Sequence, residues 1–86
     1  MEIEFTEKAE LQLAYWRQTG NQQMLRRIRA LLESIVDSPF VGIGKPEPLK
    51  HELSGYWSRR ITDEHRLVYS VKNGRILVVQ YRFHYK

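Results

Sequence analysis

All three prolines and three of the five glycines of this 86-residue chain lie between residues 39 and 55. Proline has no amide hydrogen to donate to a helix, and glycine weakens helices, so this stretch cannot be helical. We therefore expect a structured loop over residues 39–56, with a different hydrophobic pattern on each side of it. Both sides should belong to one domain, residues 1–86, because so short a chain buries only one continuous core.

The residues before this loop have the pattern of two helices. Thr6 is a candidate N-cap of the first helix, which Gly20 should end, while Asn21 should cap the second and Ser38-Pro39 should end it. The stripes at helical spacing are Ala9, Leu13 and Trp16 in the first helix, and Met24, Ile28, Leu31, Leu32 and Ile35 in the second. We expect the two helices to run antiparallel, with these stripes facing the core.

Alternating apolar residues predict strands at the N-terminus and after the loop. The expected strands are 1–5, 56–61, 66–72 and 75 to about 84. With the helices, they predict an α+β domain in which two N-terminal antiparallel helices pack on one face of a twisted, mostly antiparallel β-sheet. The chain has no cysteine, so its stability should come from side-chain packing alone.

The turn at Lys72-Asn73-Gly74 decides which side chains share a face of the sheet. A two-residue Asn-Gly turn would mix apolar with polar residues, so we expect a three-residue turn that sets Leu67 opposite Val79 and Tyr69 opposite Leu77. The apolar face would then be Leu67, Tyr69, Val71, Leu77, Val79 and Tyr81, and the opposite, polar face would hold Arg66, Gln80, Arg82 and His84.

The net charge of +4 is unevenly distributed along the chain. Residues 1–39 hold five Lys and Arg against six Asp and Glu, whereas residues 40–86 hold nine against four. A positive field confined to one half favours nucleic acid as a partner, although a basic solvated surface explains the charge equally well. Hydrophobic residues are 42% of the chain with no run long enough to span a bilayer, so we expect a cytoplasmic protein without a membrane segment.

The second half contains the groups that cleave RNA without a metal: a base for the 2′-hydroxyl, cations for the phosphate and an acid for the 5′-oxygen. Glu47 between two prolines is the candidate base, and His84 is the candidate acid. The candidate phosphate ligands are Lys50, Arg60, Arg66 and Arg82. The spacing of the three histidines matches no zinc motif, and no glycine-rich phosphate loop is present, so we expect neither metal nor cofactor.

Each candidate also has an ordinary structural interpretation. Strand arginines are usually exposed residues with cross-strand partners, a carboxylate in a loop is rarely a base, and His84 close to the chain end would usually be a surface residue. These residue types alone therefore do not establish an enzyme.

A longer pattern resembles a known family. Its residues are the Tyr15-Trp16 pair, Pro39-Phe40, the run from Gly42 to Tyr69 that contains Lys-Pro-Glu-Pro-Leu-Lys and His-Arg-Leu-Val-Tyr, and the ending Arg82-Phe83-His84-Tyr85. The run is similar to the YoeB toxins of the RelE/YoeB superfamily almost residue for residue. The resemblance implies a RelE-like, microbial-ribonuclease-like fold and a ribosome-dependent endoribonuclease that cleaves mRNA in the A site.

The resemblance assigns a role to each matching residue. Glu47 falls on the family's general base, Arg66 on the arginine that stabilises the pentavalent phosphate, His84 on the general acid and Tyr85 on the residue that orients the substrate. The basic residues expected to bind RNA or the ribosome are Lys45, Lys50, Arg59, Arg60 and Arg82. The chain departs from the family pattern at Ile43, Phe83 and Lys86, which bears on codon preference and on the contacts of the C-terminus.

The resemblance also implies partners: mRNA on the ribosome, a YefM-like antitoxin and a second copy of the chain in a homodimer. Two other functions stay open at this point. One is a non-catalytic repressor that binds nucleic acid through the basic face, and the other is a ribonuclease that works without the ribosome. A substitution of Glu47 separates the first from an enzyme, and a comparison of naked with translated RNA separates the second.

Overall fold

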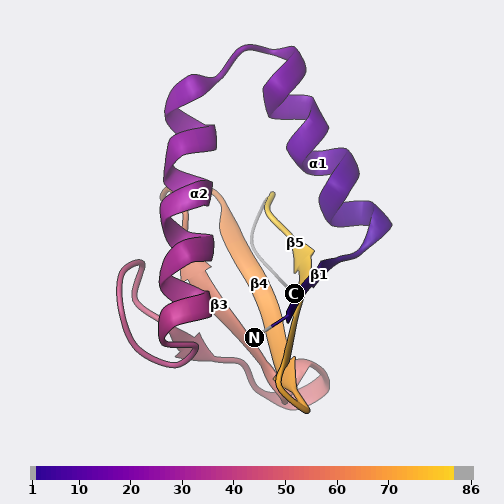
Figure 1. The fold of residues 1–86 in the computed structure, drawn as a ribbon, viewed down its shortest axis with the longest axis vertical. Coiled ribbons are helices and arrows are strands. Elements are labelled where there is room, and N and C mark those ends of the chain that lie inside the picture. Colours follow the sequence, from indigo (N-terminus) through magenta and orange to yellow (C-terminus); the bar gives the residue numbers. More distant parts are fainter. Residues whose placement is uncertain (1, 83–86) are drawn as a thin grey trace.

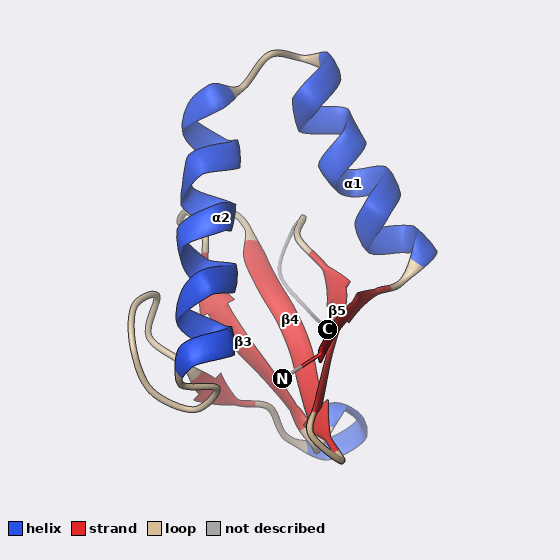
Figure 2. Cartoon of the chain, viewed as in Figure 1, coloured by secondary structure: helices blue, strands red, loops and turns tan. Residues whose placement is uncertain are grey.

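The computed structural model of the protein describes residues 2–82, in which two helices lie over one face of a five-stranded sheet (Figures 1 and 2). The elements in chain order are β1 (Glu2–Phe5), α1 (Glu7–Gln18), α2 (Gln22–Asp37), β2 (Glu47–Pro48), a 3₁₀ turn η1 (His51–Leu53), β3 (Tyr56–Arg60), β4 (Arg66–Lys72) and β5 (Arg75–Gln80). The strand order is β1-β5-β4-β3-β2, and β1 with β5 is the parallel pair of a sheet that is otherwise antiparallel. The predicted α+β class is confirmed.

Local signals place both helices where they were predicted. Oγ1 of Thr6 accepts a hydrogen bond from the amide of Ala9 at 3.1 Å, and Oδ1 of Asn21 accepts one from the amide of Met24 at 3.1 Å. Gly20, between the helices, has a φ of 68°, a left-handed conformation that favours glycine. Within residues 2–82, neither helix is long and apolar enough to cross a membrane.

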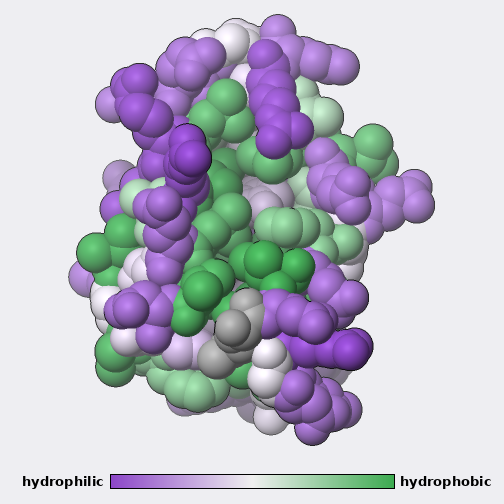
Figure 3. All heavy atoms as spheres, in the orientation of Figure 1, coloured by the Kyte–Doolittle hydropathy of each residue, from purple (hydrophilic) through white to green (hydrophobic). Residues whose placement is uncertain are grey.

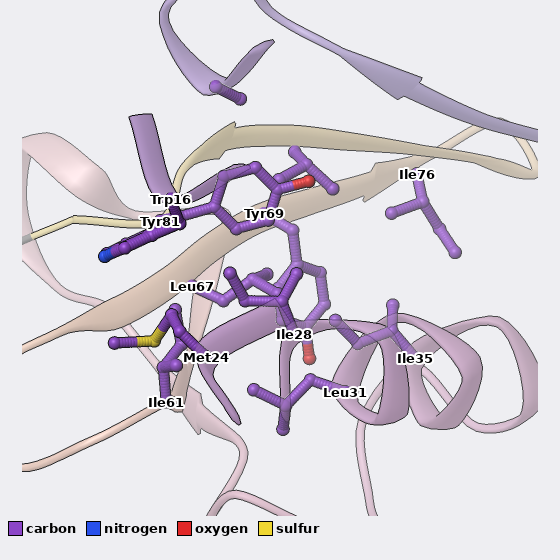
Figure 4. Packing of buried hydrophobic residues seen from close by; sticks show 12 residues of the cluster. Trp16, Met24, Ile28, Leu31, Ile35, Ile61, Leu67, Tyr69, Ile76 and Tyr81 are labelled. Carbon is purple, nitrogen blue, oxygen red and sulfur yellow. The ribbon is translucent and has the colours of Figure 1, made fainter. Parts of the chain in front are cut away.

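The core lies between the helices and the sheet (Figure 4). Its buried residues are Ala9, Trp16, Met24, Ile28, Leu31, Ile35, Ile61, Leu67, Tyr69, Ile76, Val78 and Tyr81. The two helices meet at their connecting turn and diverge from there (Figure 1), and apolar side chains gather in the space between them, flanked by hydrophilic ones (Figure 3). The apolar stripes predicted for both helices therefore do face the sheet.

The predicted register of the β4–β5 hairpin is wrong. Lys72 pairs with Arg75, so the turn has two residues, and both Asn73 and Gly74 have positive φ, at 53° and 74°. This is the conformation that Asn-Gly favours, because its twist matches that of the flanking strands. Tyr69 consequently pairs with Val78, whereas the prediction set it opposite Leu77.

A bulge restores part of the predicted face. The register shifts between Val68 and Tyr69, and Val68 pairs with Gln80, so β5 contributes one extra residue there. Beyond the bulge Tyr81 returns to the buried face, as predicted for it and for the three β4 residues Leu67, Tyr69 and Val71. The error is confined to β5, where Ile76 and Val78 occupy the core in place of Leu77 and Val79.

The loop predicted over residues 39–56 contains two short regular elements. Strand β2 pairs with β3, with Glu47 opposite Ser58 and Pro48 opposite Trp57, and the turn η1 follows. Pro48 is tolerated in β2 because the strand lies at the edge of the sheet. The pairing fixes Glu47 to the sheet by backbone contacts.

The Tyr81 hydroxyl supplies a test of the core. It is buried, and within residues 2–82 it has no hydrogen-bond partner. Burial raises the pKa of Tyr81 above the ordinary 10.0, because the phenolate is disfavoured away from water. The folded state therefore holds the phenolic proton more tightly than the unfolded state. The resulting contribution to the free energy of unfolding is fully present below about pH 10 and is lost as the pH rises further.

We expect Tyr81→Phe to leave the free energy of unfolding at neutral pH unchanged or higher, because it removes a buried hydroxyl without a partner. The variant should also lose less stability than the parent protein between about pH 7 and about pH 11. Urea denaturation at both pH values measures this, with the more exposed Tyr15→Phe as control. A marked loss of stability at neutral pH would show that the hydroxyl has a partner.

Candidate active site

The face of the sheet turned away from the helices, called the open face below, carries a row of four side chains. Glu47 pairs with Ser58, Ser58 with Val68, and Val68 with Gln80, and residues paired directly across strands point to the same side. Val68 is buried but does not belong to the core cluster between helices and sheet, which places this row on the open face. Glu47 lies at one end of the row and is exposed.

Two arginines form the next row of the open face. Arg60 pairs with Arg66, and each lies two residues along its strand from the Glu47 row, so all three side chains share the open face. A strand separation of about 4.8 Å and a rise of about 3.3 Å per residue put the backbones of Glu47 and Arg66 about 12 Å apart. Side chains of this length can approach one small group from two sides.

The guanidinium of Arg66 is anchored by the turn that precedes its own strand. Nη1 donates to the carbonyl oxygens of Thr62 at 2.6 Å, Asp63 at 3.1 Å and His65 at 3.1 Å. Oγ1 of Thr62 accepts from the amides of Glu64 and His65, which holds the turn closed. All three contacts use Nη1, so among residues 2–82 the other N–H groups of Arg66 keep no acceptor and can bind one from a ligand.

Two adjacent hollows open beside these rows. One, of about 520 Å³, is lined by the consecutive residues 47–53, and thus by both Glu47 and Lys50. The other, of about 470 Å³, is lined by Val68 and Gln80 of the first row, by Tyr56, and by residues of β1–α1 and η1. Glu52 and Leu53 line both. Hollows of this size accommodate small ligands, and their linings include the carboxylates of Glu47 and Glu52 and the ammonium groups of Lys8 and Lys50.

The structure contradicts the prediction that Arg59 binds RNA or the ribosome. Its side chain is 0% exposed and lies on the helix side of the sheet, paired with the core residue Leu67. The physical reason is the alternation of a strand, which sends Arg59 and Arg60 to opposite faces. The adjacency of two arginines in an expected strand was the signal that only one of them faces the open side.

Arg82 does not lie in the row with Arg66, contrary to the predicted polar face. Oε1 of Gln12 accepts from the amides of residues 81 and 82, at 2.7 and 3.1 Å, and so turns the chain towards α1 after β5 ends. The guanidinium of Arg82 stacks over the ring of Tyr15, 4.1 Å from its centroid, and 6.0 Å from that of Trp16. A role of Arg82 in binding RNA stays a prediction.

The remaining predicted site residues divide into two groups. Lys45 and Lys50 are exposed on either side of Glu47, in the segment that leads into and out of β2. His84 and Tyr85 lie outside residues 2–82, so their roles stay predictions. The described residues thus place Glu47 on the open face with Arg60 and Arg66, while Lys45 and Lys50 flank Glu47 along the chain. The salt bridges within residues 2–82 leave both Glu47 and Arg66 unpaired.

Residues 5–85 match the family described as the YoeB-like toxin of bacterial type II toxin–antitoxin systems. The chain belongs to this family. The toxin YoeB of Synechocystis sp. is 54% identical over 71 residues, 83% of each chain. The toxin YoeB of Escherichia coli K12 is 45% identical over 85 residues, 99% of this chain and 100% of the relative.

Solved structures of YoeB toxins share the fold throughout. A YoeB/ParE toxin from Agrobacterium tumefaciens superposes with a TM-score of 0.94 at 44% identity, covering 99% of this chain and 100% of that one. A YoeB–YefM complex from Staphylococcus aureus gives 0.88 at 43% identity, and a YoeB dimer from the same organism gives 0.88 at 42%, each covering 99% of this chain and 98% of the other. The RelE-like fold predicted for the chain is confirmed.

Proposed function

We propose that this YoeB-family toxin is an endoribonuclease that cleaves mRNA in the ribosomal A site by metal-independent acid–base catalysis and so stops translation. The observation that carries the proposal is the placement of the exposed Glu47 carboxylate one row from Arg60 and Arg66 on the open face. A base and two guanidinium groups around one space suit a reaction in which negative charge builds up on a phosphate.

In the proposed reaction Glu47 takes the proton of a 2′-hydroxyl, and the 2′-oxygen attacks the adjacent phosphorus. The bond from phosphorus to the 5′-oxygen breaks, and His84 gives its proton to that oxygen. The products are a 2′,3′-cyclic phosphate and a 5′-hydroxyl. Arg66 donates its remaining N–H groups to the phosphate, while its three carbonyl contacts keep the guanidinium in place as charge develops.

The proposed partners follow from the family and from charge. Lys45, Lys50 and Arg60 are exposed around Glu47, a surface that suits the RNA backbone and, when the toxin is held inactive, an acidic segment of a YefM-like antitoxin. The solved YoeB–YefM complex and YoeB dimer support both an antitoxin and a homodimer for this chain. The place of action that we propose is the cytoplasm, where ribosomes translate mRNA.

The test is to map cuts on one message in a purified translation system, with and without ribosomes. We expect cuts within the translated region that require ribosomes and that disappear when a YefM-like antitoxin is added. Equal cleavage of naked RNA would instead show a ribosome-independent ribonuclease. Binding without any cleavage would show a repressor and would overturn the enzymatic proposal.

A further inference from the structure

The side chain of Arg59 is a buried cation, and most of its hydrogen bonds hold one loop to the sheet. It is 0% exposed, and all three of its guanidinium nitrogens donate. Nη1 donates to Oγ of Ser34 at 2.7 Å and to the carbonyl of Ile43 at 3.1 Å. Nη2 donates to the carbonyls of Ser38 at 2.7 Å and Val41 at 2.9 Å. Nε donates to the hydroxyl of Tyr69 at 3.1 Å. Three of the five acceptors are carbonyls of the loop 38–44.

The charge of Arg59 has no carboxylate partner within residues 2–82, where the salt bridges are His65–Glu64 and Arg75–Glu2. A buried charge is tolerated only when hydrogen bonds replace its lost hydration. The loop carbonyls supply that replacement, so the burial of Arg59 and the conformation of the loop depend on each other. A lysine cannot substitute, because a single ammonium nitrogen cannot reach acceptors spread around a planar fork.

Two further contacts tighten this arrangement. The Tyr69 hydroxyl, which accepts from Arg59, donates to the carbonyl of Pro39 at 2.6 Å. Gly42 and Gly44 have φ of 123° and 82°, and a Cβ at Gly42 would lie 2.4 Å from Oγ of Ser34 and 3.1 Å from Nη1 of Arg59. A side chain at Gly42 is therefore excluded by Ser34 and the guanidinium, and a side chain at Gly44 is excluded by Leu31.

The loop leads directly to Glu47. The carbonyl of Gly44 accepts from the amide of Arg60 at 2.7 Å, and Glu47 then pairs with Ser58, so the chain is joined to β3 on both sides of the Lys45-Pro46 segment. Arg59 lies in β3 between these two attachments but points to the other face of the sheet. The loop held by the guanidinium on the buried face is therefore continuous with the segment that carries the carboxylate on the open face.

We propose that Arg59 is a positioning residue of the active site, which holds Glu47 in place through the loop 38–44 without touching the substrate. This inference rests on the proposed function. A displacement of about 1 Å of a catalytic group can cost on the order of 100-fold in rate. Arg59→Lys keeps the charge but removes the planar guanidinium and most of its hydrogen bonds to the loop. Because Arg59 does not touch the substrate, this variant should lower kcat for message cleavage by about 100-fold while KM changes little.

The decisive experiment measures kcat and KM for Arg59→Lys, Glu47→Gln and the double variant on translated message, with Arg26→Lys, an exposed arginine of α2, as the matched control. If Arg59 acts through Glu47, Arg59→Lys should lower the parent rate but leave the residual rate of Glu47→Gln unchanged. Hydrogen exchange of amides in residues 38–47 should also be faster in Arg59→Lys and unaltered in Arg26→Lys.

The proposal would be overturned if Arg59→Lys lowered the rate equally in the parent protein and in Glu47→Gln. It would also be overturned if Arg59→Lys changed neither kcat nor the hydrogen exchange of residues 38–47. If Arg59→Lys does not fold, Tyr69→Phe replaces it, since that variant keeps the ring and removes only the hydroxyl between Arg59 and Pro39. The same non-additive fall in kcat is then expected, and its absence counts against the proposal. Full activity of Glu47→Gln alone would instead refute the catalytic role proposed for Glu47.

Discussion

Replacement of Glu47 by glutamine should lower the rate of message cleavage by about 10²- to 10⁴-fold, the usual contribution of a general base. Glutamine has nearly the same size and keeps the pairing of β2 with β3, which is made by the backbone, but it cannot accept the proton of a 2′-hydroxyl. Because only the proton transfer is removed, KM for translated message should change much less than kcat. Single-turnover cleavage of a defined ribosome complex measures both.

The control for this substitution is Glu4→Gln. Glu4 pairs with Leu77 and is also an exposed carboxylate of the open face, but β1 lies at the opposite edge of the sheet from β2. This variant should cleave at the parent rate. If Glu47→Gln cleaved as fast as Glu4→Gln, Glu47 would not be the base.

Replacement of Leu31 by alanine should lower the free energy of unfolding by about 2–5 kcal/mol, the range for a leucine deleted from a packed core. Leu31 is 0% exposed, lies in the middle of α2 and belongs to the buried core cluster between helices and sheet (Figure 4). A Cβ on Gly44 would lie 2.6 Å from Cδ2 of Leu31, so the loop backbone rests directly on this side chain. The cavity left by alanine would therefore remove packing contacts both from the core under α2 and from the loop backbone at Gly44.

Urea denaturation with Leu11→Ala as control tests this expectation. Leu11 is a helical leucine that is 64% exposed, so its truncation should change the free energy of unfolding by less than about 0.5 kcal/mol. A similar small loss for Leu31→Ala would mean that α2 and the loop close over the cavity.

The features that could be predicted from the sequence are those set by near neighbours in the chain. The N-caps at Thr6 and Asn21 and the helical end at Gly20 depend on residues one to three positions away, and all were predicted correctly. The β4–β5 register depends on a choice between two turn types followed by a bulge. Apolar matching across the strands favoured the wrong turn, because it could not anticipate that the bulge would return Tyr81 to the core.

In the candidate site too, features set by the local sequence could be predicted and features set by distant residues could not. Glu47 and Arg66 were predicted for the site, and both lie on the open face because each follows the alternation of its own strand. The burial of Arg59 could not be predicted from its own surroundings in the sequence. It depends on Ser34 and Tyr69, which are 25 and 10 residues away along the chain, and on a loop that surrounds it only after folding.

The parallel pairing of β1 with β5 affects how the toxin is made. Glu2 pairs with Arg75, and β1 has no other neighbour in the described sheet, so β1 must wait for a strand that is made much later in synthesis. Contacts between such distant segments form late and slowly, because closing a long loop costs entropy. The sheet of a nascent chain therefore stays incomplete, with β1 unpaired, until β5 has also emerged from the ribosome.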